Sequence, residues 1–178
     1  VDAFGSKVPA AVRDEVLASA RILGRDARYP PGKPLLVHRL QVALALRERL
    51  YARPFYRLAH GESDGLPGLV LDRYGDVVVG QIGTAGMEAL KAEIAAAVQQ
   101  VVAPAALVWK NDSGARELEG LPSYVETAFG DAPGHVEVEE SGVRFRVPVG
   151  AGQKTGWFYD QAANRAAFLK YVRGARVL

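Results

Sequence analysis

The sequence contains no cysteine among its 178 residues, and this absence excludes several kinds of chemistry. Without a thiol the chain can form neither a disulfide nor a thiolate metal site, and it offers no cysteine nucleophile. It also lacks the run of about 18 apolar residues that a membrane-spanning helix needs. No charged and then apolar leader follows Val1. We therefore expect a cytoplasmic protein with no membrane partner.

The positive charge of the chain is concentrated at its N-terminal end. Residues 1–60 contain 11 Lys and Arg against 5 Asp and Glu, whereas residues 61–178 contain 11 against 15. Nine of the 11 N-terminal cations are arginine, whose planar guanidinium suits phosphate. One interpretation is that this end binds a polyanion such as RNA. The other is that the arginines form a solvated helix face.

The hydrophobic period alternates along the first 130 residues between the values typical of helices and of strands. Apolar positions three or four apart predict helices over 10–23, 40–50 and 85–100, the last capped by Thr84. Helix 40–50 is expected to turn Leu40, Ala43, Leu44 and Leu50 inward and Arg47 outward. Short apolar or alternating runs predict strands over 55–60, 68–75, 76–82 and 105–109. This order predicts an α+β domain whose sheet is covered on one face by the helix that follows Thr84.

Two alternating runs joined by Ser141-Gly142 predict a β-hairpin over 135–149. The two-residue loop pairs Val138 with Phe145 and Val136 with Val147 on one face. The other face then holds the opposite charges, Glu139 against Arg144 and Glu137 against Arg146. Beyond the hairpin we predict a helix over 161–172 that starts at an Asp160 cap, buries Ala162, Ala166, Leu169 and Val172, and ends at Gly174 before an apolar strand.

Three acidic residues, Glu62, Asp64 and Asp72, lie near the turn pairs Asp64-Gly65 and Pro67-Gly68. They are candidates for metal binding or acid-base work. However, no histidine lies at a ligand-like spacing, because His60 stands alone. Acidic residues beside glycine commonly accept backbone N–H bonds in turns, so we favour a structural role and expect no metal site.

The segment 150–165, GAGQKTGWFYDQAANR, has the composition of a binding site, with glycines first, then aromatics, then polar residues at a helix start. Two phosphate-binding motifs do not fit it. The P-loop needs a glycine directly before Lys154-Thr155, where Gln153 stands, and the spacing of Gly152 and Gly156 breaks the dinucleotide fingerprint. ATP and NAD are therefore disfavoured as ligands.

Two segments, HGESDGLPGLVLDRYGD (60–76) and GQKTGWFYDQAANR (152–165), resemble the motifs of a family of S-adenosylmethionine-dependent ribosomal RNA methyltransferases. Members of that family make 5-methylcytosine in large-subunit rRNA. They consist of a PUA-type RNA-binding domain, a small central α+β domain and a Rossmann-like catalytic domain. The resemblance covers residues 53–178 and implies an α+β central domain, with a mixed sheet, at 53–130. It implies further that 131–178 form the hairpin, helix and first strand that open a Rossmann-like methyltransferase domain, after a basic N-terminal segment at 1–52.

The resemblance also implies roles for particular residues. The second motif would border the pocket of the methyl donor, S-adenosylmethionine, through Lys154, Thr155, Gly156, Phe158, Asp160 and Gln161. Contacts to the RNA partner would come from Asn164 and Arg165 of the same motif. The positive charge of residues 1–60 predicts in addition that Arg47 and Arg53 contact RNA phosphates. The sequence does not indicate the oligomeric state, and a homodimer is compatible with it.

The chain carries no catalytic residue for cytosine methylation. Carbon 5 of cytosine becomes nucleophilic only after a cysteine thiolate adds to carbon 6, and the chain has no cysteine. The donor pocket of Rossmann-like methyltransferases also lies at the end of the first parallel strand, which would follow Leu178. We therefore expect an inactive segment of a methyltransferase. The alternative is a non-catalytic domain that binds RNA or another protein.

Overall fold

The computed structural model describes residues 22–24, 30–172, 174 and 176. The helix predicted over 10–23 and the strand predicted after Gly174 lie almost wholly outside these residues. Within them, no helix is long and apolar enough to cross a membrane.

A five-stranded mixed sheet forms the centre of the described structure, in the order β1-β2-β3-β4-β5. All neighbouring strands are antiparallel except β3 and β4, which are parallel because helices connect them across one face. The strands of this sheet are β1 (Phe55–His60), β2 (Leu69–Tyr74), β3 (Val77–Ile82), β4 (Ala106–Asn111) and β5 (Tyr124–Phe129). The predicted α+β class with a mixed sheet is confirmed.

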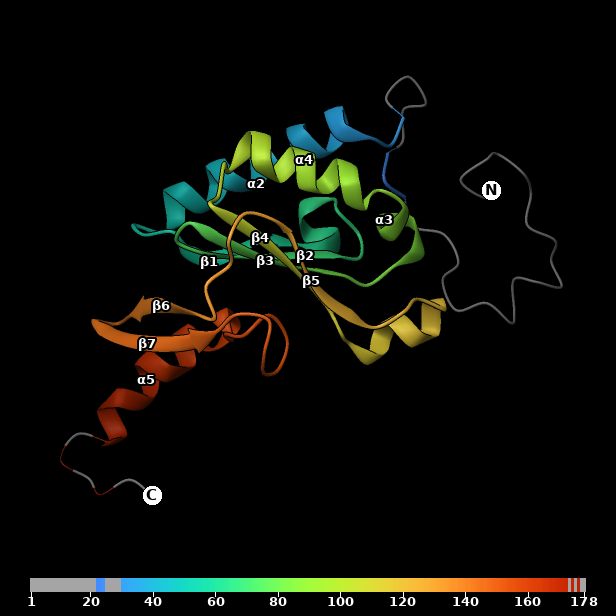
Figure 1. The fold of residues 1–178 in the computed structure, drawn as a ribbon. Coiled ribbons are helices and arrows are strands. Elements are labelled where there is room, and N and C mark those ends of the chain that lie inside the picture. The colour runs from blue at the N-terminus through green and yellow to red at the C-terminus, as the bar shows by residue number, and fades with distance from the viewer. Residues whose placement is uncertain (1–21, 25–29, 173, 175, 177–178) are drawn as a thin grey trace, which may run out of the picture.

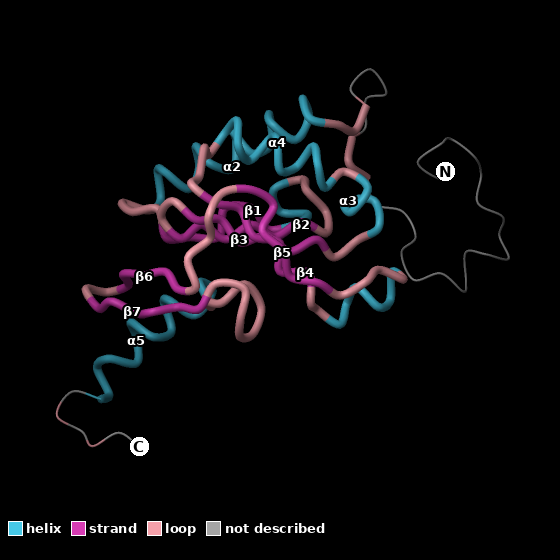
Figure 2. The backbone as a smooth tube through the Cα atoms, viewed as in Figure 1, coloured by secondary structure: helices cyan, strands magenta, loops and turns pink. Residues whose placement is uncertain are grey.

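Helices cover one face of this sheet, and a hairpin covers the other (Figures 1 and 2). The helices on the first face are α2 (Lys33–Leu50), α3 (Ala85–Ala89) and α4 (Lys91–Val101). The hairpin consists of β6 (His135–Glu140) and β7 (Val143–Pro148), and α5 (Ala162–Val172) follows it. Short 3-10 turns complete the described elements: η1 (Gly61–Asp64), η2 (Gly114–Glu119) and η3 (Tyr159–Gln161).

The helix-covered face is a continuous apolar core. Leu36 and Leu40 of α2 and Ile94 of α4 pack with strand residues such as Leu71 and Trp109 in one buried cluster. Ala43 is buried as predicted, whereas Leu50 is exposed, so its predicted inward position was wrong. Arg47, one helical turn after Ala43, also faces inward, although it was predicted to face outward. Its side chain is only 12% exposed because it forms an ion pair with Asp64.

Two helix boundaries differ from those expected. α2 begins at Lys33 rather than at 40, because Pro34 lies in the first turn, where a missing N–H costs no helical hydrogen bond. The helix predicted over 85–100 is divided at Leu90 into α3 and α4. Its predicted cap is confirmed, since the Thr84 hydroxyl accepts the Met87 N–H at 3.4 Å.

The hairpin has the predicted register throughout. Val136 pairs with Val147, Val138 with Phe145, Glu137 with Arg146 and Glu139 with Arg144. The valines pack on the hairpin side of the sheet against β2, β3 and β4, in a second buried cluster that contains Tyr74, Val79 and Val108. The predicted division of the chain into domains, with boundaries after residues 52 and 130, remains a prediction.

The last helix, α5, differs from the prediction in how it begins and in which of its residues are buried. Asp160 lies inside η3, and the residue before that turn, Phe158, makes no side-chain cap. The predicted Asp160 cap was therefore wrong, because the chain enters α5 through a tight 3-10 turn. None of the described α5 residues is buried, and Leu169 is 53% exposed. The predicted inward positions Ala162, Ala166, Leu169 and Val172 are consequently not part of a core in the described structure.

Candidate functional site

The two motifs singled out in the sequence meet on the hairpin-covered face of the sheet. The Tyr74 hydroxyl, at the end of β2, accepts the Trp157 N–H at 3.1 Å and lies 3.3 Å from the carbonyl oxygen of Thr155. The Tyr159 hydroxyl donates to the carbonyl of Arg73 at 2.8 Å. These bonds join residues 81 to 86 positions apart. Strand β2 therefore fixes the backbone of the loop that carries Lys154 and Thr155.

A buried carboxylate lies at the centre of this junction. Asp72 is fully buried and accepts two bonds from Arg57, its neighbour on β1, at 2.9 Å and 3.0 Å. The hydroxyl of Thr155, also buried, donates to the same carboxylate. A buried charge is costly unless it is paired and hydrogen-bonded, so Arg57 and Thr155 together stabilise it. The hydrogen bond to Asp72 also raises the pKa of the Arg57 guanidinium.

A second ion pair holds the aromatic part of the loop. Arg165 binds both carboxylate oxygens of Glu140, at 2.6 Å and 2.7 Å, and donates to the Phe158 carbonyl at 2.8 Å. The hydrogen bond from Arg165 lowers the pKa of Glu140. Trp157 lies between these groups and the hairpin. Its ring centroid is 4.7 Å from that of Phe145 and 4.6 Å from the Arg165 guanidinium carbon, and its Nε1–H donates to Glu140 at 3.2 Å.

The backbone of the loop takes conformations that depend on glycine. Gly156 has φ +120°, where a Cβ would come within 3.0 Å of the Pro148 carbonyl oxygen and of a Val147 methyl carbon. A side chain at this position would therefore strain the backbone and crowd the hairpin. Lys154 also has positive φ, at +50°, in the left-handed region that few non-glycine residues occupy.

Most of the predicted donor-binding residues lie together on the outer side of this junction. The Lys154 ammonium is 4.4 Å from the centroid of the Phe158 ring. The Gln161 amide donates to Asp160 at 3.1 Å and accepts from Asn164 at 2.8 Å. Lys154, Asp160, Gln161 and Asn164 are exposed. The hydrogen bond from Gln161, and then the charges of Lys154 and Arg57, lower the pKa of Asp160. The outer side thus carries an ionised carboxylate beside a cation and an aromatic ring.

The other predicted residues take structural positions. Thr155 and Gly156 lie within the junction, and Arg165 is bound to Glu140. Arg47 and Arg53 are not brought to the junction loop. The Arg47 guanidinium binds both oxygens of Asp64 at 2.6 Å and 2.8 Å, and Arg53 pairs with Glu139 on the hairpin. Contacts of these residues with a donor or with RNA remain predictions.

Of the acidic residues of the first motif, Asp64 has the structural role that the turn pattern favoured, whereas Asp72 lies in β2 and is bound by side chains. Asp64 accepts the His60 N–H at 2.7 Å and also forms the ion pair with the Arg47 guanidinium. Asp72 is bound to Arg57 and Thr155. Across the described ranges, no three His, Asp or Glu side chains are grouped as a metal site would require.

Sequence reasoning missed three side chains that hold the site: Arg57, Tyr74 and Glu140. The signal for Arg57 was its charge between two buried strand residues, Tyr56 and Leu58, opposite Asp72. Tyr74 stands two residues after Asp72 and therefore shares its face of the sheet. Glu140, the last residue of β6, gave no signal in the sequence, because its partner Arg165 lies 25 positions away.

The fold is shared with solved methyltransferase structures. A putative SAM-dependent methyltransferase from Streptococcus mutans superposes with a TM-score of 0.67 over 80% of this chain and 37% of that chain, at 22% identity. A putative methyltransferase solved as a complex with SAH gives the same score and identity, over 80% of this chain and 36% of that chain. At this identity the likeness establishes the fold. No protein-family model matches the chain.

Sequence similarity points to one kind of methyltransferase. Over 146 residues the chain is 39% identical to the Ribosomal RNA large subunit methyltransferase I of Photobacterium profundum, a match that covers 80% of this chain and 37% of the relative. The protein of the same name from Aeromonas hydrophila is 37% identical over 164 residues, which cover 89% of this chain and 41% of the relative. The chain is thus homologous to one part of these proteins and spans less than half of their length.

Proposed function

We propose that the chain is a segment of an S-adenosylmethionine-dependent methyltransferase that makes 5-methylcytosine in large-subunit ribosomal RNA. The observation that carries this proposal is the sequence similarity to proteins named ribosomal RNA large subunit methyltransferase I. The choice of cytosine carbon 5 rests on the resemblance of the two motifs, which form one junction in the fold. In this proposal the junction holds the loop that borders the donor pocket.

The side chains of the loop suit the methyl donor, which is a cofactor with a carboxylate, an ammonium, ribose hydroxyls and an adenine ring. The Lys154 ammonium would attract the carboxylate of the donor, and the Asp160 carboxylate and Gln161 amide would bind its ammonium or hydroxyl groups. Phe158 would provide an aromatic surface. Thr155 and Gly156 would act indirectly, by fixing the backbone. When bound, the donor supplies an electrophilic methyl group on its sulfonium.

The rRNA partner would approach from the side that carries Asn164, and the basic N-terminal segment would add phosphate contacts. Arg53 is more available for this role than Arg47, because its side chain is 58% exposed against 12%. A cytoplasmic location follows from an rRNA substrate. A homodimer remains compatible with the chain.

The segment alone would not complete the reaction, because it offers no thiolate to activate cytosine. The cysteine would come from another part of the parent protein. The test is to incubate the parent protein, and separately this chain, with large-subunit rRNA and labelled S-adenosylmethionine, and to analyse the nucleosides by mass spectrometry. We expect labelled 5-methylcytosine from the parent protein and none from the chain.

Two outcomes would contradict this proposal in different ways. A label on another nucleotide or atom would keep methyl transfer and overturn the cytosine assignment. Binding of rRNA by the parent protein without any transfer of label would favour the alternative of a non-catalytic RNA-binding domain. A matched pair of variants of the parent protein, Asp160→Asn and Asp131→Asn, would show whether loss of activity is specific to the loop, because both positions are exposed carboxylates.

A further inference from the structure

The ion pair between Glu140 and Arg165 joins the hairpin to the end of the loop that the second motif forms. Glu140 is the last residue of β6, and Arg165 lies in the first turn of α5. Arg165 donates to both carboxylate oxygens of Glu140, at 2.6 Å and 2.7 Å. Such a two-point contact fixes the orientation of the guanidinium as well as its distance. The hairpin therefore determines where the Arg165 side chain lies.

The same guanidinium also binds the main chain of the loop. The Arg165 Nη2 donates to the Phe158 carbonyl at 2.8 Å, and the Gln161 N–H donates to that carbonyl at 3.1 Å. Phe158 directly precedes η3, the turn that contains Asp160 and Gln161. One carbonyl group thus links Arg165 both to the residue that carries the aromatic ring and to the turn that carries the polar groups. A shift of Arg165 would disturb both.

Trp157 packs against the ion pair and helps to keep its geometry. The centroid of its ring is 4.6 Å from the guanidinium carbon of Arg165, and its Nε1–H donates to Glu140 at 3.2 Å. The side chains of Glu140 and Arg165 are 14% and 34% exposed. A partly buried pair is screened less by water and salt than an exposed one. We therefore expect this ion pair to persist in solution.

The ion pair is a poor site for an RNA phosphate, the partner that the motif resemblance implied for Arg165. Its two charges cancel, so it adds no net attraction for a polyanion. A phosphate that took the guanidinium would also leave the mostly buried Glu140 carboxylate unpaired, which is costly. Arg165 is better placed to act through the loop that it holds.

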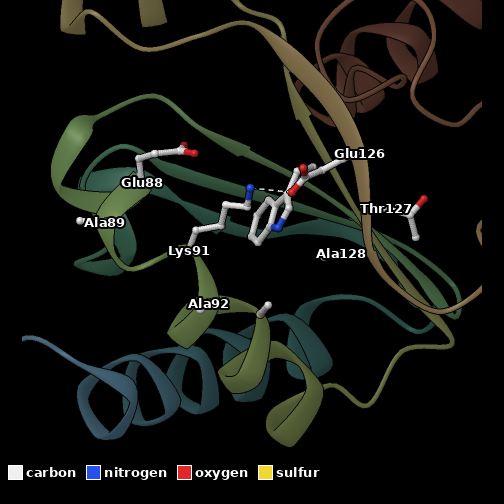
Figure 3. Close-up of a pocket in the computed structure, with 9 residues that line it drawn as sticks. Glu88, Ala89, Lys91, Ala92, Glu126, Thr127 and Ala128 are labelled. Carbon is white, nitrogen blue, oxygen red and sulfur yellow. Dashed lines mark ion pairs between the residues drawn. The ribbon is translucent and has the colours of Figure 1, made fainter.

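An ion pair on the other face of the sheet provides a comparison. Lys91 on α4 and Glu126 on β5 reach toward each other across a surface hollow and pair at 2.5 Å (Figure 3). The Lys91 ammonium also lies 4.5 Å from the centroid of the Tyr124 ring. These contacts join side chains of the sheet and its covering helix, away from the junction. Loss of the Glu126 charge therefore controls for the loss of a carboxylate from an ion pair.

From these contacts we propose that Glu140 and Arg165 form a positioning device for the methyl donor. Glu140 holds Arg165, and Arg165 holds the Phe158 carbonyl. The Phe158 ring is thereby fixed relative to the turn that presents Asp160 and Gln161. Neither member of the ion pair touches the donor itself. The inference rests on the proposed function, in which the loop borders the donor pocket.

The test is a double-mutant cycle in the parent protein, with binding of S-adenosylmethionine measured by titration calorimetry. Glu140→Gln and Arg165→Gln each remove one charge of the pair. Each should weaken donor binding about tenfold, as expected for loss of a charged hydrogen bond. Because the two residues act as one device, the double variant should bind no more weakly than the single variants. Additive losses, about a hundredfold in the double variant, would overturn the proposal, and Glu126→Gln should bind as wild type does.

A second readout separates positioning from contact with RNA. Positioning predicts that Arg165→Gln raises the KM for S-adenosylmethionine and leaves the salt dependence of RNA binding unchanged. A phosphate contact predicts the reverse, weaker RNA binding with a smaller salt slope and an unchanged donor affinity, and that result would overturn the proposal. Arg165→Lys, which keeps the charge but not the planar fork, repeats the test without leaving the Glu140 carboxylate unpaired.

The wild-type measurement tests the proposed function separately. A wild-type parent protein that does not bind S-adenosylmethionine would contradict both the proposed function and this inference. A parent protein that binds the donor equally well in wild type, Glu140→Gln and Arg165→Gln would overturn the inference alone. Thermal unfolding of each variant shows that the fold is retained, so that a loss of affinity is assigned to the loop.

Discussion

The two faces of the central sheet are closed by different kinds of interaction. Among the residues that the structure describes, 16 buried ones form an apolar cluster on the helix-covered face, whereas the cluster on the hairpin side has seven. The hairpin side, which has the smaller apolar cluster, also contains the polar junction of Asp72, Thr155, Arg57 and Tyr74. Apolar packing is non-directional, but hydrogen bonds fix atoms in particular positions. We infer that the first face provides most of the stability and that the second sets the position of the loop.

The largest effect is expected on the helix-covered face. Leu40→Ala removes a fully buried side chain and should lower the free energy of unfolding by about 3 kcal/mol. Leu46→Ala, on the same helix but 49% exposed, should change it by no more than about 0.5 kcal/mol. Denaturant titration measures both. Equal effects of the two variants would contradict the assignment of stability to this face.

A smaller but more local effect is expected at the junction. Thr155→Val removes the hydroxyl that donates to buried Asp72 and should cost about 1.5 kcal/mol. The Trp157 N–H, which donates to Tyr74, should then exchange faster with solvent. Thr155→Ser keeps the hydroxyl and serves as the control. If the valine variant exchanged as slowly as wild type, the junction would not be what holds the loop.

Acid should loosen the hairpin side as Glu140 becomes protonated. The pKa of Glu140 is lowered from the ordinary 4.5 by its hydrogen bond from Arg165. Its contribution to stability is therefore present above pH 4.5 and is lost as the pH falls through the lowered pKa. Exchange of the Trp157 indole N–H, which donates to Glu140, should accelerate in that range. In Glu140→Gln this pH dependence should be absent, and its persistence would assign the transition to another group.

The smallest effect is expected for the exposed ion pair between Arg53 and Glu139. Exposed pairs contribute little because water and salt screen them, so Arg53→Ala should change the free energy of unfolding by less than about 0.5 kcal/mol. If Arg53 contacts RNA as predicted, the same variant should weaken RNA binding by the parent protein and reduce its salt dependence. A large loss of stability would instead make Arg53 a structural residue.

Local patterns in the sequence were sufficient for the parts of the fold that local chemistry determines. The hairpin register followed from alternation and a two-residue turn at Ser141-Gly142. Strand β1 has the predicted bounds, and β2 and β3 differ from theirs by one residue at the ends. Strand β5 was not predicted, because it is an edge strand whose central residues are exposed and therefore lack a buried alternation.

The junction could be predicted only in part. The motif resemblance selected Thr155 and its neighbours, and its first motif contains Asp72 and Tyr74, but it did not indicate that these two residues hold the loop. The pairing of Arg57 with Asp72 depends on the register of β1 and β2, which shifts between Arg57 and Ala59. The contact of Tyr74 with Thr155 spans 81 positions, beyond the reach of any periodicity. The predicted Asp160 cap failed because a 3-10 turn, rather than a capped α-helix, follows the loop.

We propose that contacts from β2 hold the second motif in the conformation that binds the methyl donor. Titration calorimetry of the parent protein with S-adenosylmethionine tests it most directly, with Thr155→Val compared with Thr155→Ser and wild type. We predict that the valine variant binds the donor about tenfold more weakly, about 1.4 kcal/mol, and that the serine variant binds nearly as wild type does. A folded valine variant with unchanged affinity would contradict the claim.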